Sequence, residues 1–226
     1  MAERQRERQF DQGHRCHVAV MCRDQPLGPA RIAAAGHGPG VDGLPQEAKT
    51  FRPFLTVTDD DQDATAAGFV RERHGDHFDI AVAAYPEIHP QAESYQSDIN
   101  FLKLKFDAGA NHAITQYFYN LEAYFYFLEQ CLAAGIEKPI YAGVMPITNY
   151  ENLARFSRNC GAEIPRWMCK KLESYEGDAD SIRQFGIEVV TQMCQTLLDN
   201  GCPGIHFYTM NQVEPTTQIY HNLGLG

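Results

Sequence analysis

Basic residues are few in this sequence. Its 226 residues include 19 Lys and Arg against 29 Asp and Glu, which gives a formal net charge of −10. Nucleic acids and anionic membranes attract basic surfaces, so neither is expected as a main partner. No apolar run approaches the ~20 residues of a membrane span, and the charged residues 1–8 do not resemble the start of a signal peptide. These absences predict a cytoplasmic protein that binds neither nucleic acid nor membrane.

The usual patterns of metal and phosphate sites are also missing. The seven cysteines form no Cys-x-x-Cys pair and are odd in number, which favours reduced thiols over a disulfide framework. There is no Walker loop, nucleophile elbow or His-Glu-x-x-His helix. Residues 38–43 fit the pattern G-x-G-x-x-G, but no strand precedes them, which indicates a loop. The aspartates at 59–61 and 63 would suit a cation but are more typical of the solvated start of a helix, and no metal site is predicted.

From residue 78 onward, strand and helix patterns alternate. The apolar content of 44% is typical of a globular chain. The length of 226 residues suits one large domain or two small ones. The predicted strands cover 78–84, 112–118, 139–145 and 204–209. The predicted helices cover 92–108, 121–134, 150–159, 165–175, 179–200 and 215–223. Repetition of strand and helix predicts an α/β fold, with a parallel sheet and helices outside it.

The first 74 residues differ from the rest. Residues 28–46 are rich in Gly, Pro and Ala, which favours loop over core. A strand is predicted at His17–Met21 and a helix over 64–73, and no further strand is expected in this region. The chain is therefore divided into a divergent N-terminal segment, 1–74, and an α/β part, 75–226.

Side chains suited to ligand binding follow two of the predicted strands. Tyr85 and His89 come after strand 78–84, and Gln116 lies near the end of strand 112–118. Ligands of parallel α/β barrels bind at the carboxyl ends of the strands. On the next helix, Asp98 and Lys105 lie seven residues apart, roughly 10 Å along the axis, where they could bind a ribose and a pyrophosphate. These contacts suit a flavin dinucleotide; the alternative is surface packing and solvated charge.

Three more titratable residues attract attention. Glu87 is a candidate acid, although no sequence pattern indicates a perturbed pKa. His112 and His206 lie within predicted strands. They are interpreted as histidines of the core or its rim and not as ligands.

Six motifs resemble the methylenetetrahydrofolate reductase family in order and spacing, over about residues 75–226. They are Ala-Ala-Tyr-Pro-Glu-Ile-His-Pro (83–90), Asp-Ala-Gly-Ala-Asn (107–111), Ile-Thr-Gln-Tyr-Phe (114–118), Gly-Val-Met-Pro-Ile (143–147), Ile-Pro-Arg-Trp-Met (164–168) and His-Phe-Tyr-Thr-Met-Asn (206–211). The resemblance implies a (β/α)8 barrel of the TIM type. Such barrels need about 250 residues, so the expected barrel is incomplete and lacks N-terminal strands.

The resemblance also implies two sets of site residues. It assigns FAD binding to Tyr85, His89, Ala92, Asp98 and Lys105. It assigns the folate and the nicotinamide, which use one site in turn, to Gln116, Asn152, Phe156 and Gln212. Gln212 stands where the family often has arginine, and a neutral amide cannot form a charged fork with the glutamate tail of folate.

The implied reaction reduces 5,10-methylenetetrahydrofolate to 5-methyltetrahydrofolate, with FAD as cofactor and NAD(P)H as co-substrate, in a homo-oligomer that supports methionine supply. The family's proton-donating glutamate lies in a Phe-Glu-Phe strand that this sequence lacks. Loss of a positioned acid costs ~10²–10⁴-fold in rate, and only Asp24, within Cys-Arg-Asp (22–24), is a tentative substitute. Two alternatives stay open: a non-catalytic remnant that binds flavin, and another flavin-dependent barrel such as a proline dehydrogenase relative.

Overall fold

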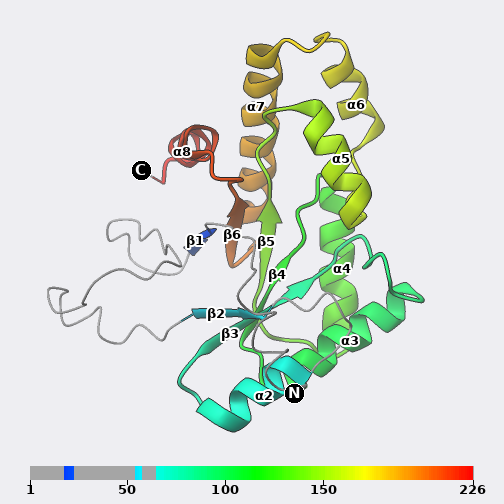
Figure 1. Ribbon diagram of the computed structural model, residues 1–226, viewed down its shortest axis with the longest axis vertical. Coiled ribbons are helices and arrows are strands. Elements are labelled where there is room, and N and C mark those ends of the chain that lie inside the picture. Colours follow the sequence, from blue (N-terminus) through cyan, green and yellow to red (C-terminus); the bar gives the residue numbers. More distant parts are fainter. Residues whose placement is uncertain (1–17, 23–53, 58–64, 226) are drawn as a thin grey trace, which may run out of the picture.

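A six-stranded sheet forms the centre of the molecule (Figure 1). The structure is a computed structural model and describes residues 18–22, 54–57 and 65–225. The strand order is β1-β6-β5-β4-β3-β2. The strands are β1 (Val18–Cys22), β2 (Phe54–Val57), β3 (Asp79–Ala84), β4 (His112–Thr115), β5 (Ile140–Val144) and β6 (Gly204–Tyr208).

The strands from β2 to β6 are parallel and lie side by side in chain order. In register, Ala81 faces His112, and Ala142 faces Ile205. This arrangement confirms the predicted parallel α/β fold of the barrel type. Within the described ranges β1 and β2 are the two edges of the sheet, so these residues form part of a barrel and not a closed one.

Two predictions about the N-terminal region need correction. Strand β2 was not expected, yet it pairs in parallel with β3 along its four residues. The strand predicted at His17–Met21 is present as β1, but it runs antiparallel to β6. It is therefore not the first strand of a parallel barrel. The division of the chain at residue 74 stays a prediction.

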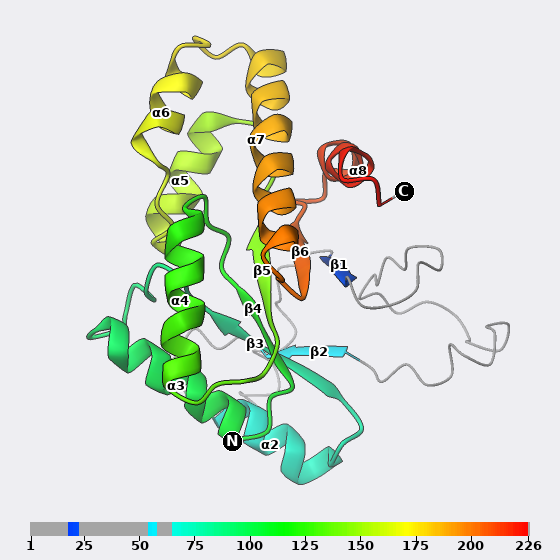
Figure 2. The same ribbon diagram turned by 180° about the vertical axis from the view of Figure 1, so that it is seen from behind.

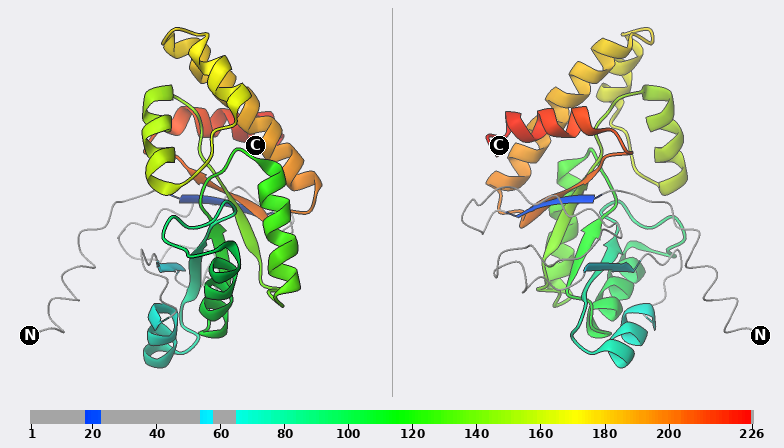
Figure 3. Two further views of the ribbon diagram at one scale, coloured as in Figure 1. Left: turned by 90° about the vertical axis from the view of Figure 1, so that its right-hand side faces the viewer. Right: turned by 60° about the vertical axis from the view of Figure 1, so that its left-hand side comes forward.

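Seven helices of the described chain cover and extend the sheet. They are α2 (Thr65–His74), α3 (Tyr95–Asp107), α4 (Leu121–Ala133), α5 (Tyr150–Cys160), α6 (Arg166–Glu173), α7 (Ala179–Asp199) and α8 (Val213–Asn222). Asn120 and Asn149 cap α4 and α5 by accepting backbone N–H bonds. Figures 1 and 2 show α5 and α6 beyond the carboxyl ends of β4 and β5, and Figure 3 shows α8 beside α7. Among the described helices, none combines the length and apolarity that a membrane crossing requires.

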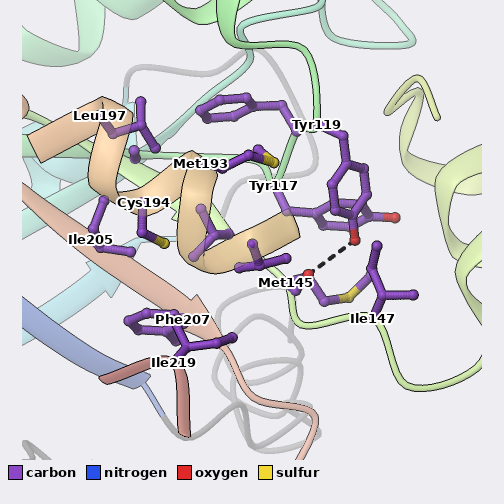
Figure 4. Close-up of a cluster of buried hydrophobic side chains, with 14 of the residues drawn as sticks. Tyr117, Tyr119, Met145, Ile147, Met193, Cys194, Leu197, Ile205, Phe207 and Ile219 are labelled. Atoms are coloured by element: carbon purple, nitrogen blue, oxygen red, sulfur yellow. Dashed lines mark hydrogen bonds between the residues drawn. The ribbon is translucent and has the colours of Figure 1, made fainter. Parts of the chain in front are cut away.

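The larger core lies between β5, β6 and helices α4 to α8. Alternate residues of β6, Ile205 and Phe207, point into it and are fully buried, as period-two alternation requires. Figure 4 shows Met193 and Leu197 of α7 against them. In the same view Tyr119 donates a hydrogen bond of 3.0 Å to the Met145 carbonyl, which joins the segments after β4 and β5.

Arg71 of α2 joins three elements at the amino-terminal side of the sheet. Its Nε donates to the Gly109 carbonyl (2.8 Å), and its Nη1 donates to the carbonyls of Gly75 and Phe78, each at 2.9 Å. Its Nη2 donates to Asn111 Oδ1. These bonds fix α2 to the start of β3 and to the turn between α3 and β4.

The face of the sheet that points away from the larger core carries two buried histidines, His112 of β4 and His206 of β6. His112 Nδ1 lies 3.5 Å from Asp79 Oδ1, and its ring meets the edge of Tyr141. His206 is 3% exposed, and its Nδ1 has no hydrogen-bond partner among the described residues. Burial, and then the neighbouring His112, lower the pKa of His206 to about 4. The geometry agrees with the interpretation of both residues as core histidines.

The stability of the protein is expected to fall in acid because His206 must be neutral when folded. Its folded pKa of about 4 lies below the unfolded value of 6.5, so the stabilisation is present above pH 6.5 and is lost as the pH falls towards 4. The loss attributable to His206 is on the order of 3 kcal/mol. Urea unfolding between pH 7 and pH 4 should show a flatter pH dependence for His206→Gln. The exposed His221→Gln should retain the wild-type slope, and equal slopes for all three proteins would contradict the assignment.

Candidate functional site

The predicted site residues gather at the carboxyl ends of β3 to β6. Two depressions lie there. The β3–β4 hollow is small, with a volume of about 10 Å³. It is lined by Tyr85, Pro86, Glu87, Ile88, Gln116, Tyr117, Cys160, Gly161 and Ala162. The β5–β6 groove is larger, at about 210 Å³, and is described below.

The loop after β3 is held in a strained conformation. Ile88 has φ +74°, a left-handed value that is rare for a β-branched residue and costs about 1–3 kcal/mol. On either side of it, the rings of Tyr85 and His89 meet edge to face, with centroids 4.4 Å apart. The His89 amide donates to Asp98 Oδ2 at 2.8 Å, and the Ala92 amide donates to the His89 carbonyl. Strain of this kind often marks ligand-binding loops.

Helix α3 places Asp98 and Lys105, two of the predicted FAD-binding residues, in a partly buried region. Ser94 caps the start of the helix in a capping box: its Oγ accepts from the Ser97 amide, and its own amide donates to Ser97 Oγ. Lys105 is 8% exposed. Burial raises the pKa of Asp98, and the His89 amide and the charges of His89 and Lys105 counteract part of this rise. Asp98 and Lys105 do not line the β3–β4 hollow. Asp98 accepts from the amide of His89, whose ring packs against Tyr85 of the hollow.

Glu87 is the titratable residue whose properties the sequence did not reveal. Its Oε2 accepts a hydrogen bond of 2.9 Å from the Glu163 amide, between α5 and α6. Its Oε1 is buried without a partner among the described residues. Burial raises the pKa of Glu87 to about 7, and the bond from the Glu163 amide opposes the rise. Near neutral pH this carboxyl therefore holds a proton part of the time.

A hydroxyl and thiol cluster lies beside Glu87. The Tyr117 hydroxyl is 3.1 Å from Ser157 Oγ and accepts from Cys160 Sγ at 3.3 Å. Burial, followed by the bond from Cys160, raises the pKa of Tyr117. The phenol is therefore neutral at physiological pH and acts as a hydrogen-bonding group. All described cysteines with a placed side chain are free thiols, as predicted.

The β5–β6 groove brings three of the four predicted substrate residues together. Asn152 and Phe156, one turn apart on α5, share it with Gln212, which precedes α8. The other lining residues are Met145, Pro146, Thr148, Asn149, Leu153, Arg155 and Met210. Met210 and Asn211 have positive φ angles, so this wall of the groove is also a strained turn.

The fourth predicted substrate residue, Gln116, lies in the β3–β4 hollow with Tyr85. The structure thus brings Tyr85 and Gln116 to one hollow, and Asn152, Phe156 and Gln212 to one groove. His89 does not line the hollow, but its ring packs against Tyr85. Helix α5 contributes to both. Asp24, the tentative acid, lies outside the described residues, as do the loop over 38–43 and the aspartates at 59–61 and 63.

Arg155 is a groove residue that the sequence analysis did not single out. Its Nη2 donates to Asn152 Oδ1 at 3.0 Å, and its guanidinium carbon lies 5.4 Å from the centre of the Phe156 ring. The helical spacing of three between Asn152 and Arg155 was a usable signal. The groove itself was not predictable from α5 alone, because its opposite wall comes from residues about 60 positions later.

A chain-ordered parallel sheet from β2 to β6, with helices outside it, defines an α/β protein of the barrel type, a class whose ligands bind at the carboxyl ends of the strands. A family model described as methylenetetrahydrofolate reductase matches residues 61–224. The chain therefore belongs to the methylenetetrahydrofolate reductase family, which confirms the resemblance seen in the six motifs.

Several curated proteins are similar to this chain. A probable methylenetetrahydrofolate reductase (NADPH) of Caenorhabditis elegans is 43% identical over 158 residues, covering 70% of this chain and 24% of that protein. The 5,10-methylenetetrahydrofolate reductase of Escherichia coli is 40% identical over 148 residues, covering 66% of this chain and 50% of that protein. The chain thus spans half or less of the length of these relatives.

One solved structure is a more distant match. It is an uncharacterized protein from Clostridium thermocellum that binds two copies of 5-methyl-5,6,7,8-tetrahydrofolic acid. The TM-score is 0.49 at 20% sequence identity, and the match covers 70% of this chain and 55% of that one.

Proposed function

We propose that this chain is a flavin-dependent reductase that converts 5,10-methylenetetrahydrofolate to 5-methyltetrahydrofolate with NAD(P)H. The observation that carries the proposal is the grouping of Asn152, Phe156 and Gln212 in one groove, next to the hollow that holds Tyr85 and Gln116. These residues come from four separate parts of the chain. Family membership supports the same activity.

The residues after β3 and on α3 fit the requirements of FAD. Tyr85 and His89 offer an aromatic surface and a hydrogen-bonding edge, in a loop fixed by the 2.8 Å bond to Asp98. Lys105 supplies positive charge on the same helix as Asp98. Bound FAD would supply the two-electron transfer from the nicotinamide to the folate. The chain's own residues would bind, orient and shield these ligands.

The β5–β6 groove fits a flat ligand with amide or carbonyl edges. The partly exposed Phe156 ring can lie against a pterin or nicotinamide ring. Asn152 and Gln212 can donate and accept hydrogen bonds at its edge, and Gln116 can do so from the neighbouring hollow. We further propose that the protein is a cytoplasmic homo-oligomer, as the family resemblance suggests. No proton donor is assigned, and Asp24 stays a tentative substitute for the family's glutamate.

Flavin reduction tests this proposal. Purified full-length protein should bind added FAD, and anaerobic NADH or NADPH should bleach the flavin absorbance. Methylenetetrahydrofolate should then restore the absorbance. Failure to bind FAD at saturating concentration would contradict the proposal. Bound flavin that NAD(P)H does not bleach would indicate a non-catalytic flavin-binding protein, and bleaching by proline would indicate the proline dehydrogenase alternative.

A further inference from the structure

The ten residues that line the β5–β6 groove include one charged side chain, Arg155. The rest of the lining is apolar, aromatic or neutral polar. The chain as a whole carries a formal net charge of −10, so its overall field repels anions. An anionic ligand in this groove therefore depends on a local positive charge.

The guanidinium of Arg155 is oriented but not neutralised by the described residues. One of its N–H groups donates to Asn152 Oδ1, which leaves most of its five donors for other partners. Glu151 lies one turn before it on α5. Even so, none of the ion pairs between described residues includes Arg155. The bond to Asn152 and the nearby Phe156 ring restrict where the guanidinium can point.

We infer that Arg155 binds the anionic group of the ligand whose flat ring lies on Phe156, and so selects ligands that carry a carboxylate or phosphate. A planar guanidinium matches both groups as a two-pronged donor. This inference rests on the proposed function. Under that function the anion is the glutamate carboxylate of the reduced folate or a phosphate of the nicotinamide dinucleotide. Gln212, on another wall of the groove, can donate a hydrogen bond but supplies no positive charge.

The test compares ligands that differ in the anion and variants that differ in the cation. The full-length protein with FAD is titrated with 5-methyltetrahydrofolate and with 5,6-dimethyltetrahydropterin, which keeps the N5-methylated pterin but carries no carboxylate. NADH and reduced nicotinamide riboside, which lacks phosphate, form the second pair. The variants are Arg155→Met, Arg155→Lys and Arg158→Met, the last an exposed arginine of α5 that does not line the groove.

In one of the two pairs, Arg155→Met should weaken binding of the anionic ligand about tenfold. The affinity for its uncharged counterpart should stay within about twofold of the wild-type value. Arg155→Lys should recover part of the loss, because an ammonium keeps the charge without the fork. Arg158→Met, with the same net charge as Arg155→Met, should bind as wild type. Loss in the folate pair would assign the glutamate carboxylate, and loss in the dinucleotide pair would assign the phosphate.

Two results would overturn the inference. One is an equal loss for charged and uncharged ligands, which would make Arg155 a shaping residue of the groove. The other is the same affinities in all variants. If the wild-type protein bound none of the four ligands, the proposed function itself would fail, and the inference with it.

Discussion

Replacing Gly143 by alanine is expected to lower the free energy of unfolding by roughly 3 kcal/mol or more, the upper range for inserting an atom into a packed core. A Cβ at this position would lie 2.1 Å from the Thr115 carbonyl oxygen and 2.8 Å from the Tyr208 ring. The nearer atom belongs to the backbone of β4, so it cannot rotate away. The space beside Gly143 is where Tyr208 reaches across β5 and donates to the Thr115 carbonyl at 3.0 Å.

Urea unfolding of Gly143→Ala and Gly68→Ala provides the measurement and its control. A Cβ at Gly68, in α2, would meet only Ala108 at 3.9 Å, an ordinary contact. Alanine in a helix is favoured over glycine by about 1 kcal/mol, so this control should be as stable as wild type or more stable. If Gly143→Ala unfolded at the wild-type urea concentration, the close approach of β4, β5 and Tyr208 would be wrong.

Asp98→Ala is expected to weaken FAD binding about 30-fold, which corresponds to roughly 2 kcal/mol for a buried hydrogen bond to a charged group. The carboxylate accepts from the His89 amide, and this bond holds the loop that contains the left-handed Ile88. Without it, the loop can relax and separate the Tyr85 and His89 rings. The variant also removes the negative charge that lies near Lys105.

Two further variants separate geometry from charge in that experiment. Asp98→Asn keeps an oxygen that can accept from His89 but removes the charge, so its FAD affinity should fall between those of wild type and Asp98→Ala. Asp107→Ala removes an exposed aspartate of the same helix, which is paired with Lys103, and should have no effect. Flavin fluorescence titration gives the three dissociation constants. Wild-type affinity in Asp98→Ala would remove α3 from the proposed flavin site.

Local patterns predicted most of the fold because each element from β3 onward has its own local cause. The strand predicted over 112–118 ends earlier, at Thr115, because the following residues leave the sheet: the Tyr117 hydroxyl contacts Ser157, and the Tyr119 hydroxyl bonds to Met145. The position of β2 and the direction of β1 depend on their partners β3 and β6. Such pairings over long stretches of chain leave no periodic signal in a single segment.

The sequence predicted which residues lie at the candidate site better than it predicted their pKa values. Asn152 and Phe156 are four residues apart on a helix, so their shared face follows from the sequence. Their meeting with Gln212 depends on the packing of α8 beyond β6. The raised pKa of Glu87 comes from burial and is partly offset by the amide of Glu163, 76 residues later in the chain, and no local pattern contains that information.

The hydrogen bond from the Glu163 amide to Glu87 ties the loop after β3 to the segment that follows α5. Gly161 at the end of α5 also lies against Pro90 of that loop. A molecule that orders one of these segments therefore changes the free energy of ordering the other. By thermodynamic linkage, any effect of a ligand in the hollow on binding in the groove is matched by an equal effect in the reverse direction.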